Sequence, residues 1–325
     1  MRLTKQDYLM PTTYSMFARR YTLGALLSVA AALMLAAGCG SSQDNVFPGP
    51  KFMFLDGPGG SPTTLNGISN KDTVAGFTTA NGANTNFLST AGNTVSVLNV
   101  GDPAAGQVTA VNSSGTAVGG ANGKAFSFPA GGVIAPITVP GSTAAIAFGI
   151  NDAGVIVGQD TVGANTPGFA DVNGVFTTII PTPTATVVNP QGVNNNGDVI
   201  GFYSADGTHQ HGFLHNINTK QTTLFADPVT ARTQAGGLVL TQFLGINDKG
   251  EAVGYYQTNN GSQFGFLYNL AKQTYTFLDE PKAAPVNGVQ ITQITGVSNS
   301  GEICGFYIDA AGVQHGFIAT GATPN

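Results

Sequence analysis

The sequence contains no tryptophan, only two cysteines and few charged residues, which make up 9% of its 325 positions. Without Trp the chain cannot carry WD repeats, the Asp-box of sialidases or a tryptophan platform of the lectin type. The chain also has no nucleophile elbow, phosphate loop, HExxH or CxxC motif. No pair of carboxylates is placed by spacing alone for acid–base work. We therefore predict no catalytic residue, no metal site and no cofactor.

Positive charge is the scarcest property of the chain. Four of its twelve basic residues and one of its seventeen acidic residues lie in the first 38 positions, so the rest carries eight basic and sixteen acidic residues. A chain with so few scattered lysines has no basic patch, which excludes nucleic acid as a partner.

Glycine and small polar residues are abundant instead. The chain has 45 Gly and 17 Pro, yet 42% of its residues are apolar, with Phe, Val and Ile at regular intervals. This composition is that of a folded protein rather than a disordered one. Many short strands joined by Gly- and Asn-rich turns fit it better than helices do, so we predict an all-β fold.

Residues 1–38 have the pattern of a targeting segment. Arg19 and Arg20 precede an apolar run of about 17 residues, which is short for a membrane span and suits the core of a signal peptide. The small residues before Cys39 resemble the lipobox of bacterial lipoproteins, which implies a diacylated Cys39 and an anchor at the outer membrane or cell surface. The alternative is ordinary secretion. Residues 39–50 form a polar tether.

One motif recurs six times along the remaining chain, at intervals of 43, 39, 43, 53 and 51 residues. The copies are GISNKDTVAGF, AVNSSGTAVGG, GINDAGVIVGQ, GVNNNGDVIGF, GINDKGEAVGY and GVSNSGEICGF, which begin at Gly67, Ala110, Gly149, Gly192, Gly245 and Gly296. A Phe-centred segment and then a β-rich segment follow each copy. This spacing is that of one four-stranded propeller blade.

The sixth unit has no closing segment of its own. Residues 51–58, KFMFLDGP, match the closing segment TYTFLDEP of the fifth unit. An N-terminal strand that completes the last blade would leave no open ladder edge there. We therefore predict a six-bladed β-propeller over residues 51–320 with a short tail at 321–325. An open β-solenoid of six repeats is the alternative.

The repeats, of the form G-[IV]-N-x-x-G-x-[IV]-x-G followed by H-x-F, resemble those of HAF-type extracellular repeat proteins of bacteria. The resemblance covers nearly the whole chain after the tether. The His-Ala-Phe of that family appears here only as His211-Gly212-Phe213 and His315-Gly316-Phe317. The resemblance implies an extracellular setting and a propeller-like fold, and it brings no catalytic residues.

The acids in GINDKGEAVGY suggest a calcium loop, but the other copies favour a hairpin turn. Ser or Asn always occupies the first turn position and Gly the fourth in five copies, with Asp72 the exception. Asp occurs at the second position only twice, and the third position holds lysine at 71 and 249. The repeat thus keeps the turn chemistry and not the oxygen ligands that calcium needs. We predict a type I turn with a bulge.

Histidine and cysteine have similarly plain interpretations. His209, His211 and His215 share one parity on a strand, but six residues of strand span roughly 20 Å, too far for one metal ion. Cys304 occupies a position that holds Ala, Val or Ile in the other copies, so we predict a buried thiol. If Cys39 carries lipid, no disulfide can form.

The last three units carry aromatic pairs after their second strand, and these end in Tyr203, Tyr256 and Tyr307. On a propeller this position lies near the face that binds ligands, so we predict that half of that face is lined by tyrosine, with packing between blades as the alternative. The same half carries the longest insertion, residues 226–242, whose Arg232 is the only Arg after residue 38. Long loops on rigid propellers often carry function, so Arg232 is a further candidate for ligand binding, with a solvated loop as the alternative.

The sequence as a whole predicts an envelope-anchored, extracytoplasmic, monomeric propeller that binds or scaffolds a glycan, peptide or protein. The membrane is a further partner, through lipid on Cys39. A polysaccharide-active glycosidase or lyase and a purely structural surface protein are the alternatives, because propellers host all three.

Overall fold

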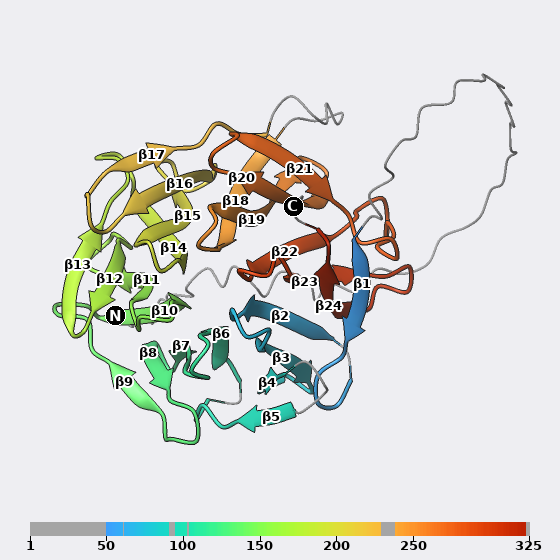
Figure 1. Ribbon diagram of the computed structural model, residues 1–325, viewed down its shortest axis with the longest axis horizontal. Coiled ribbons are helices and arrows are strands. Elements are labelled where there is room, and N and C mark those ends of the chain that lie inside the picture. The colour runs from blue at the N-terminus through green and yellow to red at the C-terminus, as the bar shows by residue number, and fades with distance from the viewer. Residues whose placement is uncertain (1–49, 61, 91–94, 103, 229–237, 323–325) are drawn as a thin grey trace, which may run out of the picture. The chain divides into compact units, whose positions relative to one another are not determined.

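Six four-stranded antiparallel sheets make up the computed structural model, which describes residues 50–60, 62–90, 95–102, 104–228 and 238–322. The sheets are arranged as the blades of a β-propeller around a common centre (Figure 1). The six-bladed propeller predicted from the repeat is therefore confirmed, and the open solenoid is not formed. None of the described segments is a helix long and apolar enough to cross a membrane.

In blades 1 to 5 the strands follow the chain order from the centre outward, and in blade 6 the N-terminal strand takes the outermost place. Blades 1 to 3 consist of β2 (Thr63–Ile68), β3 (Val74–Ala80), β4 (Ala83–Ser89) and β5 (Val95–Leu98); β6 (Gln107–Val111), β7 (Ala117–Ala121), β8 (Lys124–Phe128) and β9 (Ala135–Ile137); and β10 (Ala144–Ile150), β11 (Ile156–Thr161), β12 (Gly168–Val172) and β13 (Val175–Ile179). Blades 4 to 6 consist of β14 (Val187–Val193), β15 (Asp198–Ser204), β16 (His211–Asn216) and β17 (Thr222–Leu224); β18 (Leu238–Ile246), β19 (Glu251–Thr258), β20 (Gln263–Asn269) and β21 (Thr274–Leu278); and β22 (Thr292–Val297), β23 (Ile303–Ile308), β24 (Gln314–Thr320) and β1 (Lys51–Leu55).

Blade 6 is built from both ends of the propeller sequence, as predicted. β1 pairs antiparallel with β24 from Lys51↔Thr320 to Leu55↔Gly316. Phe52 packs edge-on against Phe317, with ring centroids 5.4 Å apart. The N-terminal strand thus covers the ladder edge that β24 would otherwise expose.

The repeated motif forms the turn between the first and second strand of each blade, here called the joint. In blade 5 the Asn247 carbonyl accepts from Gly250 N–H, and the Asn247 N–H donates to Glu251 O. The Asn247 Oδ1 accepts from the N–H groups of Lys249 and Glu251, and Gly250 is left-handed at φ 76°. This is the bonding of a type I turn with a glycine bulge. In blade 1 the glycine position is held by Asp72, at φ 58°. The hairpin prediction is confirmed.

A second glycine follows in every blade, in the middle of the second strand. The innermost strand shifts register by one residue beside it, as between Phe243 and Gly245 in blade 5, and this bulge brings the Gln242 carbonyl oxygen over Gly254. A Cβ on Gly254 would overlap that oxygen. The same overlap arises in all six blades, at Gly76, Gly119, Gly158, Gly201, Gly254 and Gly305. The recurring glycine is therefore a steric requirement of the bulge.

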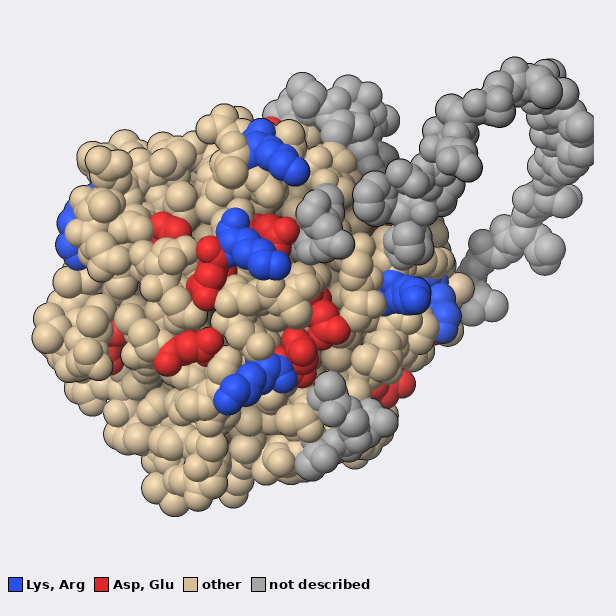
Figure 2. Space-filling model, viewed as in Figure 1, with Lys and Arg blue, Asp and Glu red and all other residues tan. Residues whose placement is uncertain are grey.

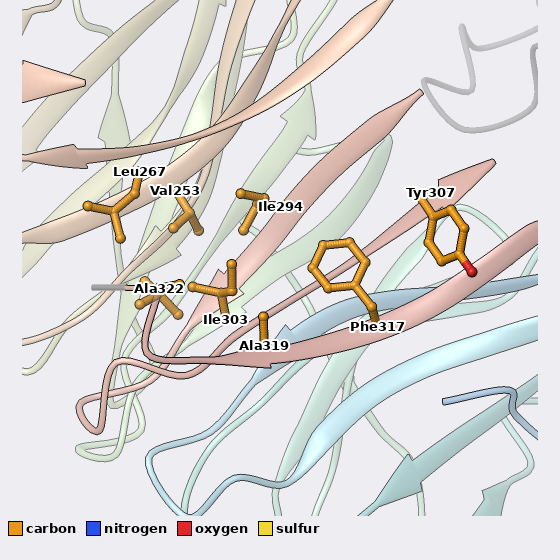
Figure 3. Packing of buried hydrophobic residues seen from close by; sticks show 9 residues of the cluster. Val253, Leu267, Ile294, Ile303, Tyr307, Phe317, Ala319 and Ala322 are labelled. Atoms are coloured by element: carbon orange, nitrogen blue, oxygen red, sulfur yellow. The ribbon is translucent and has the colours of Figure 1, made fainter. Parts of the chain in front are cut away.

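Most of the hydrophobic core lies between neighbouring blades. One cluster joins Val253 and Leu267 of blade 5 to Ile294, Ile303 and Phe317 of blade 6, as Figure 3 shows. Cys304 belongs to a cluster shared by blades 6 and 1 and is a fully buried free thiol. Burial raises the pKa of this thiol to about 12, so the thiolate is disfavoured and the predicted inert packing role is confirmed.

Candidate functional site

The six joints meet at one mouth of the central channel. Residues from all six blades line a hollow of only about 50 Å³ there, enough for one or two waters. Acidic side chains gather around the centre of the face seen in Figure 2. Carboxylates at a channel mouth are candidates for catalysis or metal binding, and their contacts decide between these roles and a structural one.

An inner arc of hydrogen bonds runs through the first residue of five joints and spans four of the six blade junctions. Its asparagines use Oδ1 within their own turn and donate Nδ2 to the carbonyl of the same position in the next blade. These bonds, of 2.9–3.1 Å, run from Asn112 to Asn151, Asn194, Asn247 and Ser298. The sequence predicted the contacts within the turn. It did not reveal that the same amide ties adjacent blades together.

An outer ring runs through the second residue of each joint. The backbone N–H at this position donates to the side chain at the same position in the next blade, across five of the six junctions. These side-chain acceptors are Asp152, Asn195, Asp248, Asn299 and Asn70. Ser113 takes the remaining place, and its buried hydroxyl has no hydrogen-bond partner among the described residues.

Both aspartates of this ring are occupied by N–H donors. Burial alone would raise the pKa of Asp152, but donors from Ser113 and Asn70 outweigh it, and the pKa is lowered. The pKa of Asp248 is likewise lowered, since amides of Asn299 and Asn195 outweigh burial. Acid–base catalysis needs two groups whose pKa values are pushed apart. These two carboxylates are acceptors that hold the ring together.

A different carboxyl pair lies where blade 6 meets blade 1. Burial, and then the charge of Asp72 and a hydrogen bond with it, raise the pKa of Glu302. The negative charge of Asp72 therefore favours the protonated form of Glu302. Within the described ranges, no three His, Cys, Asp or Glu side chains gather as metal ligands.

The aromatic pairs lie at the opposite ends of the blades, which we call the loop face because the loops between second and third strands, such as β3–β4, form it. Tyr256 and Tyr307 are each 3% exposed and belong to hydrophobic clusters. Tyr307 lies at the end of its cluster beside Phe317 (Figure 3). The expectation that three tyrosines line an exposed surface is therefore wrong for these two, because neighbouring rings cover them. Tyr203 alone is half-buried.

Tyr203 is part of a polar group that we call the blade 4 cluster, with His211 and Asp227. Its ring lies 5.8 Å from the His211 ring, and His211 Nδ1 is 3.4 Å from Asp227 Oδ2. Thr241 donates to the other Asp227 oxygen at 3.0 Å. Burial and then the Asp227 charge raise the pKa of Tyr203, so its hydroxyl stays protonated and can donate to a ligand. His211 keeps 41% of its side chain exposed.

Blade 6 repeats this pattern in a more buried form. Tyr307 stacks on His315 at 5.4 Å, and His315 contacts Asp56 at 3.2 Å and Asp309 at 3.3 Å. Burial, followed by the charge of Glu280 and these aspartates, raises the pKa of Tyr307 to about 12. Both nitrogens of the His315 imidazole contact a carboxylate, so this cluster has less capacity to bind a ligand than the blade 4 cluster has.

The remaining predicted residues have separate fates. Arg232 and Cys39 lie outside the described residues, so their roles stay predictions. His209, in the exposed turn before β16, contacts Asp206, and His215 of β16 contacts Thr222. These two histidines therefore have separate partners.

No protein-family model matches the chain, and no curated protein does. A luciferin-regenerating enzyme of known structure is 12% identical, with a TM-score of 0.52, and the match covers 84% of this chain and 96% of that one. Virginiamycin B lyase from Staphylococcus aureus is 13% identical, over 82% and 99% of the two chains, with a TM-score of 0.46. The β-propeller domain of the Trilobed protease from Pyrococcus furiosus is 12% identical, over 78% of each, also at 0.46. Likeness at this level shows the β-propeller fold alone.

Proposed function

We propose that the protein is an extracytoplasmic binding or scaffolding module, held in the cell envelope by lipid on Cys39, and that it binds a glycan, peptide or protein partner at the loop face of blade 4. The observation that carries this proposal is the blade 4 cluster. It presents three partly accessible groups. The phenol of Tyr203 comes from β15, the imidazole of His211 from the first residue of β16, and the carboxylate of Asp227 from the segment that leads to blade 5. Such a set offers hydrogen-bond donors and acceptors beside an aromatic ring.

The face of the propeller that carries the joints supports the same interpretation. Its two channel-mouth carboxylates, Asp152 and Asp248, each accept hydrogen bonds from a neighbouring joint, which supports a structural role for them rather than that of a glycosidase acid and base. Resemblance to HAF-type proteins and to lipoproteins supports the location, which stays a proposal.

Replacing Tyr203 and His211 together with alanine is expected to weaken ligand binding at least tenfold. Because each residue supplies a hydrogen bond and ring contact worth about 1 kcal/mol, the pair accounts for roughly 2 kcal/mol of affinity. The measurement is glycan-array and pull-down profiling of the full-length protein in detergent. His215→Ala, on the same strand but outside the cluster, is the matched control. Unchanged binding in the double variant, or cleavage of an arrayed polysaccharide, would contradict the proposal.

Replacing Cys39 with serine is expected to move the protein from the membrane fraction to the soluble fraction. Serine cannot carry the thioether-linked diacylglycerol of a lipoprotein, so the anchor is lost. Fractionation and mass spectrometry of the mature N-terminus check this result. An unmodified Cys39 in the wild-type protein would refute the anchor while leaving the ligand experiment intact.

A further inference from the structure

A cavity of about 370 Å³ opens at the loop end of blade 3. Residues of the outer three strands of that blade, β11 to β13, and of the loop between β11 and β12 line it, together with the links that enter from β9 and leave for β14. This volume lies within the range of small-molecule sites. Tyr203, His211 and Asp227 of the blade 4 cluster do not line the cavity, so variants of the cavity residues test this inference apart from the proposed function.

Beside this cavity, blade 3 lacks two aromatic rings that blades 5 and 6 have. Asp160, paired with Ala145, occupies the position that Tyr256 holds in blade 5 and Tyr307 in blade 6. Thr178, paired with Phe169, occupies the position of Phe277 in blade 5 and Phe54 in blade 6. In those two blades the Tyr and Phe rings pack against each other at 5.7 Å. In blade 3 both rings are missing, and both of the residues that replace them line the cavity.

Among the described residues that line this cavity, only Asp160 is charged. It is 6% exposed, and within the described part of the chain its carboxylate has no hydrogen-bond or salt-bridge partner other than its own backbone N–H. Burial raises its pKa. An unpartnered buried carboxylate costs folding free energy, and no described side chain of the blade compensates that cost. A position that destabilises the fold without a structural gain is typical of a functional residue.

The other walls determine what could pair with this carboxylate. Phe169 and Phe176 lie 5.9 Å apart at an interplanar angle of 55° and line the cavity with Pro140 and Pro167. Ring faces attract cations, and apolar walls favour an apolar body. A neutral sugar could place hydroxyls against the polar lining residues, such as Asn165 and Thr177, but it would leave the negative charge of Asp160 uncompensated. An ammonium group on a short hydrocarbon stem satisfies both parts of the cavity.

We propose that the blade 3 cavity is a binding site for an alkylammonium group, which forms an ion pair with Asp160 while its hydrocarbon stem packs on Phe169 and Phe176. The group belongs either to a free small amine or to a lysine side chain of a peptide. The chemistry is the same in both cases, and separate probes distinguish them.

The test is calorimetric titration of the full-length protein in detergent with n-butylammonium, Nα-acetyl-lysine methylamide, n-butanol and methyl α-fucoside. Binding of n-butylammonium at least tenfold tighter than n-butanol is expected, because only the former carries the charge. Asp160→Asn should remove that preference, and Thr178→Phe should abolish binding by restoring the side chain that blade 5 has. Asp171→Asn, the same charge change outside the cavity, should bind as the wild type does and controls for the change in net charge.

Binding of both ammonium probes would identify a lysine-compatible site, and binding of n-butylammonium alone would identify a site for free amines. Equal binding of butanol and butylammonium, undiminished binding by Asp160→Asn, or preference for the fucoside would overturn the proposal. None of these outcomes bears on the blade 4 cluster.

Thermal unfolding of the empty protein gives a second readout. Because burial raises the Asp160 pKa in the folded state, the stability that this group contributes is present at low pH and lost as pH rises through that pKa. Asp160→Asn is therefore expected to raise Tm at pH 7 by roughly 2–4 °C and to leave it unchanged at acidic pH. A lower Tm at pH 7 would show that Asp160 stabilises the blade, which would contradict the assignment.

Discussion

Deletion of residues 51–57 is expected to open the ring and to destabilise the propeller by on the order of 4 kcal/mol or more. The deletion removes the five-residue ladder with β24 and uncovers Phe317, which Phe52 packs against. The exposed edge of β24 then becomes a template for pairing with another chain. Thermal unfolding and light scattering of the purified protein measure the two effects.

A permuted variant separates the loss of the strand from the loss of its position. Lys51 and Thr320 are paired, so residues 51–58 placed after Asn325 could pair with β24 through a five-residue hairpin loop. This variant should regain most of the lost Tm and remain monomeric. A deletion variant as stable as the wild type would show that the pairing of β1 with β24 contributes nothing to stability.

Gly254→Ala is expected to destabilise the protein by at least about 3 kcal/mol. The new methyl group overlaps the Gln242 carbonyl oxygen, which is backbone and cannot move without breaking the bulge. Denaturant unfolding gives the free energy of unfolding directly.

Gly250→Ala, four residues earlier, is the matched control. Its Cβ would meet only the Leu270 side chain at 3.5 Å, and its cost is the left-handed conformation, about 1–2 kcal/mol. If Gly254→Ala were no more destabilising than Gly250→Ala, the steric explanation for the recurring strand glycine would be wrong.

Blade number, strand phase and closure could all be predicted because the joint repeats a local rule. Asn247 and Gly250 specify a turn through their own side-chain and backbone preferences, so six copies locate twelve strands. The match between residues 51–58 and the fifth unit added the prediction that the N-terminal strand completes the last blade. Each of these inferences uses contacts between residues close in sequence, or identity between copies.

The site could not be predicted in the same way because it depends on contacts between blades. Tyr256 and Tyr203 occupy equivalent positions in the sequence, but only the packing around each decides which is buried. Comparison of the six copies already argued against a metal role for Asp248, but only the structure shows that donors from the neighbouring blades occupy its carboxylate. Asp160 stands out only when the strand registers show that it occupies the position of Tyr256 and Tyr307, since the sequence shows merely a missing aromatic pair.

The pairing of β1 with β24 also affects the order in which the strands fold. A ribosome makes the N-terminus first, so β1 emerges before any other strand of the propeller, yet its partner is the last strand to appear. Pairing across nearly the whole chain closes slowly, because contacts distant in sequence must wait for the segments between them. Blades 1 to 5 can each complete their own sheets during that interval. The first strand of the ring is therefore the last to be paired, and its unpaired N–H and C=O groups are available to other chains until then.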